Sequence, residues 1–391
     1  MPEIERPDIE NLPASVRAYI EALEAELAAL KAKRHVTTQS QREKLTPMSG
    51  QAETSPADFP EEPTTISVIT VSRAGVAKRT PRHLYTRQKR GGMGVFDLDT
   101  SEEDPPACLL IADVSQNLVL LTDQGRAFRV PVHELPETPV RARGTSLMTR
   151  FHLSPGEQLA LAFPDPGAPY VALLTKRGYV LWFAGHLFGE KLLAGTVLYD
   201  VAKFSPPVAA CGSRGDEDLF EPIRKTVQAA SLCRLYRRIG MRRLRFSDRH
   251  FVATRSGLAI RFASRMVPAR GCLGIRLERD DEAIAIAAVR GEDTLFLLGA
   301  DGRGAMRMVS GFRANKAPGA AGKVAMKTKH LAGVAVASQE DDIFVISRLS
   351  KIIRFSAAEL LPKAEAVQGV SCMALRADEA VAVAVSRTSR E

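Results

Sequence analysis

The feature that most constrains the fold of this chain is a hairpin-like segment that recurs six times. In each copy an aliphatic run meets a short polar turn and leaves through a second run that contains a cation at or near its end in most copies. Glycine supplies the positive φ that a tight hairpin turn needs, and flanking β-branched residues favour strands. The copies span residues 71–78, 121–129, 174–180, 253–261, 298–307 and 346–354, with the turn residues Gly75, Gly125, Gly178, Gly257, Gly302 and Ser350.

The spacing of these turns predicts a propeller-like ring of six units. Successive turn residues are 50, 53, 79, 45 and 48 positions apart. A period near 50 with a hairpin in each repeat is typical of such arrays. One hairpin cannot bury its apolar face alone, whereas stacked sheets share a core. The long spacing of 79 predicts an insertion in the fourth unit, at about residues 221–250.

A second, glycine-bearing turn follows most of the hairpins. It is most complete at residues 88–94, where three glycines occupy four positions beside Lys89 and Arg90. Six cations and no acidic residue occur from Lys78 to Gly94. Each Lys or Arg that neutralises a phosphate releases condensed counterions, so this stretch favours a polyanion backbone as its partner. Degenerate copies of the turn occur at residues 141–146, 269–274, 319–323 and 367–370.

Residues 88–94, Gln-Lys-Arg-Gly-Gly-Met-Gly, resemble the Gln-Arg-Arg-Gly-Gly-Lys-Gly box of the C-terminal DNA-wrapping domain of the DNA gyrase A protein. Six of the seven positions match if Lys89 is accepted for Arg. Met93 replaces the last lysine, which implies that one phosphate contact of the family is missing. The resemblance covers roughly residues 65–386. It implies an all-β fold, a six-bladed β-pinwheel like those of the gyrase and topoisomerase IV A subunits, that binds and bends double-stranded DNA.

The candidate DNA-binding residues are the box and the cations of the repeats. If these cations lie on one outer edge they form a curved track, and DNA laid along it must bend. Contacts to the backbone alone predict sequence-tolerant, steeply salt-dependent binding. The candidate set is Lys78, Arg79, Arg82, Arg87, Gln88, Lys89, Arg90, Gly91, Gly92, Gly94, Arg126, Arg129, Arg141, Arg143, Arg270, Arg276, Arg307, Arg313, Lys316, Lys323, Lys351 and Arg354.

Composition and motifs set further bounds on function. Lys and Arg exceed Asp and Glu by nine, which favours anionic partners. Five cysteines without a close pair, and no long apolar run, predict a cytoplasmic, nucleoid-associated protein without membrane contact. The sequence has no HExxH, no CxxC and no P-loop, so we expect no catalytic site, metal or cofactor.

The N-terminal part is expected to be separate from the ring of residues 64–391. Residues 1–13 are predicted to be disordered and residues 35–63 to form a flexible linker. Between them, residues 14–34 predict an amphipathic helix, because Val16, Ile20, Leu23, Leu27 and Leu30 follow the a/d spacing of a coiled coil. The helix would pair with a second copy, bind another protein or dock on its own propeller.

The predicted insertion at residues 221–250 carries nine cations against Glu221 and Asp248. The spacing of Arg234, Arg238 and Arg242 fits a basic amphipathic helix. Such a segment would either widen the DNA-binding rim or form a solvated surface hairpin that aids solubility. The gyrase pattern has nothing equivalent at this position.

Three functions are compatible with these patterns. About 64 residues precede the first unit, too few for the breakage-reunion region of a gyrase A protein, so we expect no topoisomerase activity from this polypeptide alone. The favoured function is non-sequence-specific binding and wrapping of double-stranded DNA, architectural or accessory to a topoisomerase. The alternatives are a non-catalytic subunit of a split type IIA topoisomerase, with a partner recruited through residues 14–34, and a protein-interaction propeller.

Overall fold

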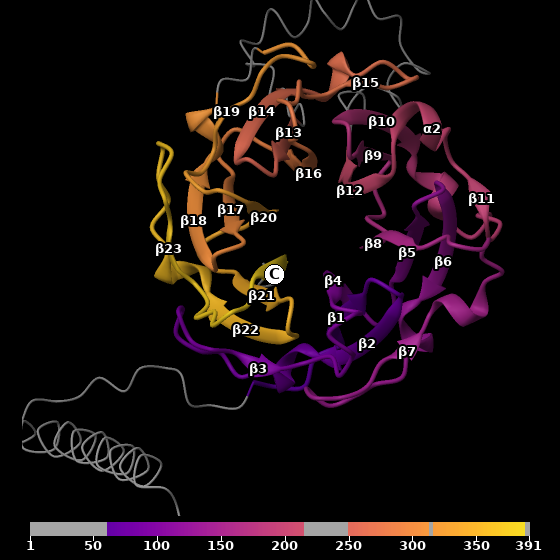
Figure 1. Cartoon of the computed structure of the whole chain (residues 1–391), viewed down its shortest axis with the longest axis vertical. Helices are drawn as coiled ribbons and strands as arrows, with labels where there is room; N and C mark the ends of the chain where they lie inside the picture. Colours follow the sequence, from indigo (N-terminus) through magenta and orange to yellow (C-terminus); the bar gives the residue numbers. More distant parts are fainter. Residues whose placement is uncertain (1–60, 215–248, 313–315, 388–391) are drawn as a thin grey trace, which may run out of the picture. The chain divides into compact units, whose positions relative to one another are not determined.

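The described part of the computed structural model comprises residues 61–214, 249–312 and 316–387. These residues form six four-stranded antiparallel sheets, or blades, arranged around a common centre (Figure 1). The all-β, six-bladed architecture expected from the repeats is confirmed. The predicted N-terminal disorder, the helix at 14–34, the linker up to residue 60 and most of the basic insertion lie outside the described residues. No helix within the described ranges is long and apolar enough to cross a membrane.

Each blade has the same strand order from the centre outward, and we number the blades by their hairpins. Blade 1 is β4 (Pro106–Asp113), β1 (Ile66–Ser72), β2 (Val76–Pro81) and β7 (Thr145–Ser146). Blade 2 is β8 (Leu159–Pro164), β5 (Asn117–Thr122), β6 (Arg126–Pro131) and β11 (Thr196–Val197). Blade 3 is β12 (Pro207–Ser213), β9 (Tyr170–Thr175), β10 (Tyr179–Ala184) and β15 (Cys272–Leu273).

The other three blades repeat this order. Blade 4 is β16 (Ala283–Val289), β13 (Arg249–Thr254), β14 (Leu258–Ala263) and β19 (Lys323–Val324). Blade 5 is β20 (Leu331–Val336), β17 (Thr294–Gly299), β18 (Arg303–Met308) and β23 (Val370–Ser371). Blade 6 is β24 (Ala380–Ser386), β21 (Asp342–Ser347), β22 (Lys351–Ser356) and β3 (Val95–Phe96).

Short helical turns follow most of the outer hairpin strands. The 3-10 helices are η1 (Arg82–Leu84), η2 (Val132–Glu134), η3 (Met148–Arg150), η4 (Gly185–Phe188), η5 (Ser264–Met266), η6 (Val309–Gly311) and η7 (Ala357–Glu359). The single described α-helical turn is α2 (Val201–Phe204). Asp200 caps it, because its carboxylate accepts from the backbone N–H groups of Ala202 and Lys203.

The six predicted hairpins are the central strand pairs of the six blades. Their turn glycines adopt φ between +75° and +82°, and Ser350 takes the same position at φ +60°. Because both faces of a blade pack against neighbouring blades, its hairpin strands are apolar on both faces. In β5, Leu118 and Leu120 face the blade 1 cluster, whereas Val119 and Leu121 face blade 3. Such a cluster of buried side chains lies at each interface between adjacent blades.

The outermost strand of each blade is supplied by another part of the chain. The glycine-bearing turn that follows one hairpin leads into a two-residue strand that pairs with the preceding blade. In the first repeat this strand is β3, which pairs with β22 of the last blade, Lys351 opposite Phe96 and Ile352 opposite Val95. The first repeat thereby joins the sixth blade and closes the ring.

Two boundaries differ from those expected from sequence. Strand β13 begins at Arg249, so the last two positions of the predicted insertion belong to blade 4. His250 is fully buried there. Glu61, placed in the flexible linker by sequence, is held against the ring by ion pairs with Arg82 and Arg354. Local composition does not show this contact, because its basic partners are distant in the chain.

Candidate nucleic-acid interface

The box, residues 88–94, lies between β22 of blade 6 and the segment that follows β23 of blade 5. Its backbone is bound there: the Gln88 N–H donates to the Arg354 carbonyl at 2.8 Å, and the Gly91 N–H donates to the Cys372 carbonyl at 2.8 Å. Gly94 has φ +71°, and a Cβ at this position would lie 2.5 Å from the Ile352 carbonyl oxygen. A side chain here would therefore press against β22 where the ring closes.

The side chains of the box face solvent. Lys89, Arg90 and Met93 are exposed, and Gln88 is half-buried. The Arg90 guanidinium donates to the Ser371 carbonyl at 3.2 Å, while its backbone N–H donates to a Glu359 carboxylate oxygen at 3.0 Å. A bound backbone with exposed cations can present positive charge at a defined place on the surface.

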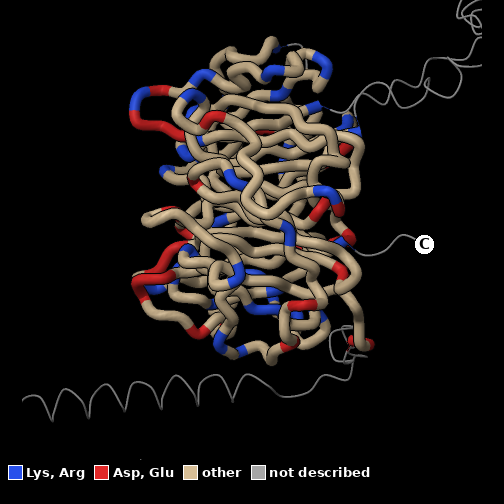
Figure 2. The backbone as a smooth tube through the Cα atoms, turned by 90° about the vertical axis from the view of Figure 1, so that its right-hand side faces the viewer, with Lys and Arg blue, Asp and Glu red and all other residues tan. Residues whose placement is uncertain are grey.

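The corresponding turns of other repeats bring further cations to the outer rim. We use this name for strands β3, β7, β11, β15, β19 and β23 and the turns that lead into them. In Figure 2 Lys and Arg lie across the part of the rim that faces the viewer, and most Asp and Glu lie toward the left and right edges. The exposed candidate cations on the outer rim are Lys89, Arg90, Arg141, Arg143, Arg270 and Lys323. Two more exposed candidates lie next to it, Arg87 beside the box and Arg276 just after β15.

Four candidates from the sequence are instead buried, which corrects the predicted set. Lys78 is 1% exposed, Arg307 is 0% exposed, and Arg79 and Arg354 are also buried. A cation without exposed surface cannot reach a phosphate while the blades remain packed. We therefore exclude these four from the interface.

Lys78 belongs to a buried polar network beside the ring closure. Its ammonium group forms an ion pair with Asp97 and donates to the Tyr85 hydroxyl at 3.3 Å. Asp97 also accepts from the hydroxyls of Tyr85 and Thr70, both at 2.5 Å. Burial lowers the pKa of Lys78, and Asp97 opposes this shift. Burial and the Asp97 charge together raise the pKa of Tyr85 well above its ordinary value.

Two of the buried arginines connect neighbouring blades. Arg79 of blade 1 donates through Nε to the Leu135 carbonyl, at the end of η2, at 2.9 Å. Arg354 of blade 6 donates to the Tyr85 carbonyl, at the end of η1, at 3.0 Å. Each occupies the fourth position after its hairpin turn. These arginines therefore satisfy carbonyl groups of the next blade.

Arg261 of blade 4 makes the same contact, and sequence reasoning missed its role. Its guanidinium donates to the Val309 and Phe312 carbonyls, at the two ends of η6, at 2.7 and 3.2 Å. The available signal was its position, four residues after Gly257, which matches that of Arg79 after Gly75. A charged residue in a strand that is buried on both faces indicates an internal partner.

The remaining candidates are partly buried. Arg126 forms an ion pair with Glu157 at 2.7 Å. Arg82 pairs with Glu61 and donates to the Ser386 hydroxyl at 3.0 Å. Lys351 lies over the Phe96 ring, 5.6 Å from its centroid. The other half-buried candidates are Gly91, Gly92, Gly94, Arg129 and Lys316, and Arg313 lies outside the described residues.

The sequence analysis also missed one rim turn. Gly195 has φ +83° and leads into β11, which pairs with β6 of blade 2. Its neighbours, Lys191 to Val197, share little with the box apart from this glycine. What the rim turns have in common is a glycine directly before the two-residue strand, namely Gly94, Gly144, Gly195, Gly271, Gly322 and Gly369.

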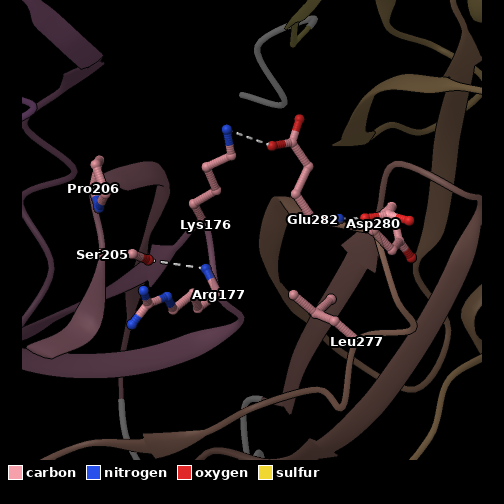
Figure 3. Close-up of a pocket in the computed structure, with 8 residues that line it drawn as sticks. Lys176, Arg177, Ser205, Pro206, Leu277, Asp280 and Glu282 are labelled. Carbon is pink, nitrogen blue, oxygen red and sulfur yellow. Dashed lines mark hydrogen bonds and ion pairs between the residues drawn. The ribbon is translucent and has the colours of Figure 1, made fainter.

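A pocket of about 460 Å³ lies where blades 3 and 4 meet (Figure 3). Two of its charged groups pair with each other, since the Lys176 ammonium lies 2.8 Å from the Glu282 carboxylate. Arg255, which does not line the pocket, also pairs with Glu282. The backbone N–H of Arg177 donates to the Ser205 hydroxyl at 3.0 Å. This mixed lining differs from the cation-rich turns of the outer rim. The described residues contain no His, Cys, Asp and Glu cluster suited to a metal ion.

Comparison with known proteins agrees with this architecture. Residues 67–104, 116–164 and 341–387 match the family model of the DNA gyrase C-terminal domain, a β-propeller. The resemblance to the gyrase A C-terminal domain is confirmed. The DNA gyrase A protein of Mycobacterium bovis is 24% identical over 340 residues, which cover 83% of this chain and 36% of that protein. The Mycobacterium leprae gyrase A protein is 25% identical over 342 residues, covering 83% of this chain and 24% of that protein.

Solved structures show the same fold. A gyrase A C-terminal domain superposes with a TM-score of 0.65 at 18% identity, over 82% of this chain and 99% of that domain. The C-terminal domain of a DNA topoisomerase IV gives a TM-score of 0.51 at 17% identity, over 82% and 93% of the two chains. The chain thus spans about a third or less of the length of the curated gyrase A proteins that it matches.

Proposed function

We propose that this chain binds double-stranded DNA without sequence specificity and bends it around the outer rim. The observation that carries the proposal is the arrangement of exposed cations: Lys89 and Arg90 of the box lie on the same rim as Arg141, Arg270 and Lys323 of other repeats. DNA that follows several of these turns must curve with the ring. The similarity to gyrase A C-terminal domains supports this use of the fold.

The energetics favour such an interface. Smooth bending of a 20–30 bp site by 40–90° costs on the order of 1–6 kcal/mol. Counterion release on phosphate neutralisation offsets this cost, and each neutralised phosphate steepens the salt dependence of log K by about 0.9. Backbone contacts place the DNA without reading its bases.

The matched region of the relatives is their C-terminal domain, so we propose that the chain has no strand-passage activity of its own. It would act as an architectural protein or beside a topoisomerase, in the cytoplasm and on the nucleoid. A catalytic partner, or a second copy of the chain, would bind through the predicted helix at residues 14–34. A tagged chain that retains a topoisomerase only when residues 14–34 are present would identify this partner.

The test is DNA bending by Lys89→Ala/Arg90→Ala, measured by energy transfer between the ends of duplexes of about 30 and 150 bp across a salt series. We expect the double variant to bend DNA less and to lower the salt slope by about 2, because about 0.9 is lost for each phosphate contact. Its stability should change by less than about 0.5 kcal/mol, because both side chains are exposed.

The matched control is Lys176→Ala/Arg177→Ala, which removes two adjacent exposed cations from the β9–β10 turn. This control should bend DNA as the unaltered chain does. Equal losses in both variants would indicate a generic charge effect, and unaltered bending in the box variant would contradict the proposal. If the unaltered chain leaves DNA straight and binds it weakly, the pinwheel is better explained as a protein-interaction scaffold.

A further inference from the structure

Phe96 is an exposed aromatic residue among the cations of the outer rim. It lies in β3, at the closure of the ring, and its side chain is 53% exposed. Its ring lies 5.6 Å from the Lys351 ammonium and 5.7 Å from the Arg141 guanidinium, measured to the ring centroid. These two cations come from blade 6 and from the turn that leads into β7, so three separate segments meet at this ring.

The equivalent positions of the other blades carry smaller side chains. Phe96 pairs with the first residue of its neighbouring hairpin strand, and the residues with that pairing elsewhere are Ser146, Val197, Leu273, Val324 and Ser371. A second large apolar side chain, Met93, is 55% exposed in the turn that leads into the same strand. Two exposed apolar groups beside Lys89 and Arg90 are not needed for phosphate contacts.

We infer that Phe96, assisted by Met93, is an apolar wedge that enters the minor groove of bound DNA and partly unstacks one base step. This inference rests on the proposed function, because it assumes that DNA follows the rim. Phe and Met are among the side chains that architectural proteins insert between base pairs, and such insertion kinks the duplex by about 20–90°. Lys89, Arg90 and Arg141 would hold the flanking phosphates.

The surrounding charges favour nucleic acid as the occupant of this apolar site. Cation–π contacts with Arg141 and Lys351 orient the Phe96 ring and keep both cations beside it. A partner that covers the ring must therefore also accept positive charge at its border. A base step flanked by phosphates has this combination of an apolar face and an anionic edge.

A wedge has a consequence that smooth bending lacks. Unstacking is easiest at pyrimidine–purine steps such as TA, whereas A-tracts are stiff. The chain should thus prefer a duplex with a TA step where the wedge enters, without hydrogen bonds to any base. The preference should disappear with the wedge, while the salt dependence set by the cations should remain.

The experiment compares the unaltered chain with Phe96→Ala and Phe96→Leu, using duplexes of about 30 bp that carry either a central TA step or an A-tract. A 2-aminopurine beside the central step reports unstacking, and energy transfer between the ends reports bending. We expect Phe96→Ala to lose the 2-aminopurine signal, the TA preference and a bend of about 20° or more. Phe96→Leu should keep all three, because leucine is also a wedge residue.

The matched control is Leu187→Ala, which removes a 45% exposed apolar side chain from η4, outside the outer rim. It should leave every readout unchanged. If Phe96→Ala unstacks and bends DNA as the unaltered chain does, the wedge is wrong while the wrapping proposal stands. If the unaltered chain neither binds nor bends DNA, both are wrong, and Phe96 is better explained as part of a protein-docking surface.

Discussion

At the scale of single residues, burial decides what a cation does in this protein. Lys78 and Lys89 belong to the same basic stretch, yet Lys78 is paired with Asp97 inside the ring and Lys89 is exposed on the rim. Removing one partner of a buried ion pair costs about 3–5 kcal/mol, whereas exposed charges contribute little to stability. The same residue type therefore stabilises the fold at one position and is free to bind a partner at the other.

Glu61 offers a test of residue-scale electrostatics through pH. Burial opposes its ionisation, but the hydrogen bonds and charges of Arg354 and Arg82 outweigh this effect and lower its pKa from the ordinary 4.5. A carboxyl group with a lowered folded-state pKa contributes stability above its unfolded pKa and loses it as the pH falls. We expect urea unfolding of the unaltered chain to show stability falling below about pH 4.5.

In Glu61→Gln this part of the acid dependence should be absent. The measurement is the difference in urea unfolding midpoint between Glu61→Gln and the unaltered chain, taken at pH 7 and at pH 3. A difference that is the same at both values would show that the Glu61 ion pairs do not stabilise the folded ring. Glu62→Gln is the control, because Glu62 is an exposed carboxylate next to Glu61.

At the scale of elements, the two-residue strands connect the blades. Such a strand is too short to be stable alone, and it persists because the preceding turn is fitted to the neighbouring blade. Gly94 shows this, since its positive φ and its approach to the Ile352 carbonyl both disfavour a side chain. The glycines that carry the resemblance to gyrase A thus have a structural role as well as a place in the proposed interface.

Gly94→Ala and Gly156→Ala distinguish the cost of a side chain at positive φ from the cost of its contact with a neighbouring strand. Gly156 has φ +81°, and a Cβ added there would have no atom within 4 Å, so alanine should cost only the left-handed backbone, about 1–2 kcal/mol. At Gly94 the contact with the Ile352 carbonyl should add about 1–3 kcal/mol. Chemical denaturation of both variants measures the difference. Equal destabilisation would show that β3 can shift on β22 without cost.

At the scale of the whole molecule, the ring and the predicted N-terminal helix are expected to contribute different properties. Deletion of residues 1–58 should convert a dimer to a monomer in sedimentation, because it removes the predicted coiled coil at residues 14–34. DNA binding should remain, since the rim is intact. A full-length chain that already sediments as a monomer would contradict the coiled-coil prediction.

Deletion of residues 1–63 should be compared with the shorter deletion, because it also removes Glu61. This longer deletion should give the same monomer with a lower melting temperature, since Arg82 and Arg354 lose an ion-pair partner. If the two truncated chains have the same melting temperature, the contact made by Glu61 does not stabilise the ring.

Much of the fold was predictable because its hairpins are local. The turn residue and its flanking apolar runs lie within ten positions of one another, so Gly75 or Gly257 can be recognised from nearby residues. Contacts between blades are not local. Arg354 reaches the Tyr85 carbonyl across 269 positions of sequence, and no pattern near either residue shows that the two meet. For that reason cations that connect blades were first assigned to the DNA interface.

The sequence by itself determined the six hairpins, the ring that they require and the basic glycine-rich box, because each depends on residues close together in the chain. Only the tertiary structure decided which cations are available to a partner. Packing one blade on the next buries Lys78, Arg79, Arg307 and Arg354, and ring closure brings Phe96 between Lys351 and Arg141. Whether a charge is exposed depends on what covers it, and in a closed ring the covering residues come from another repeat.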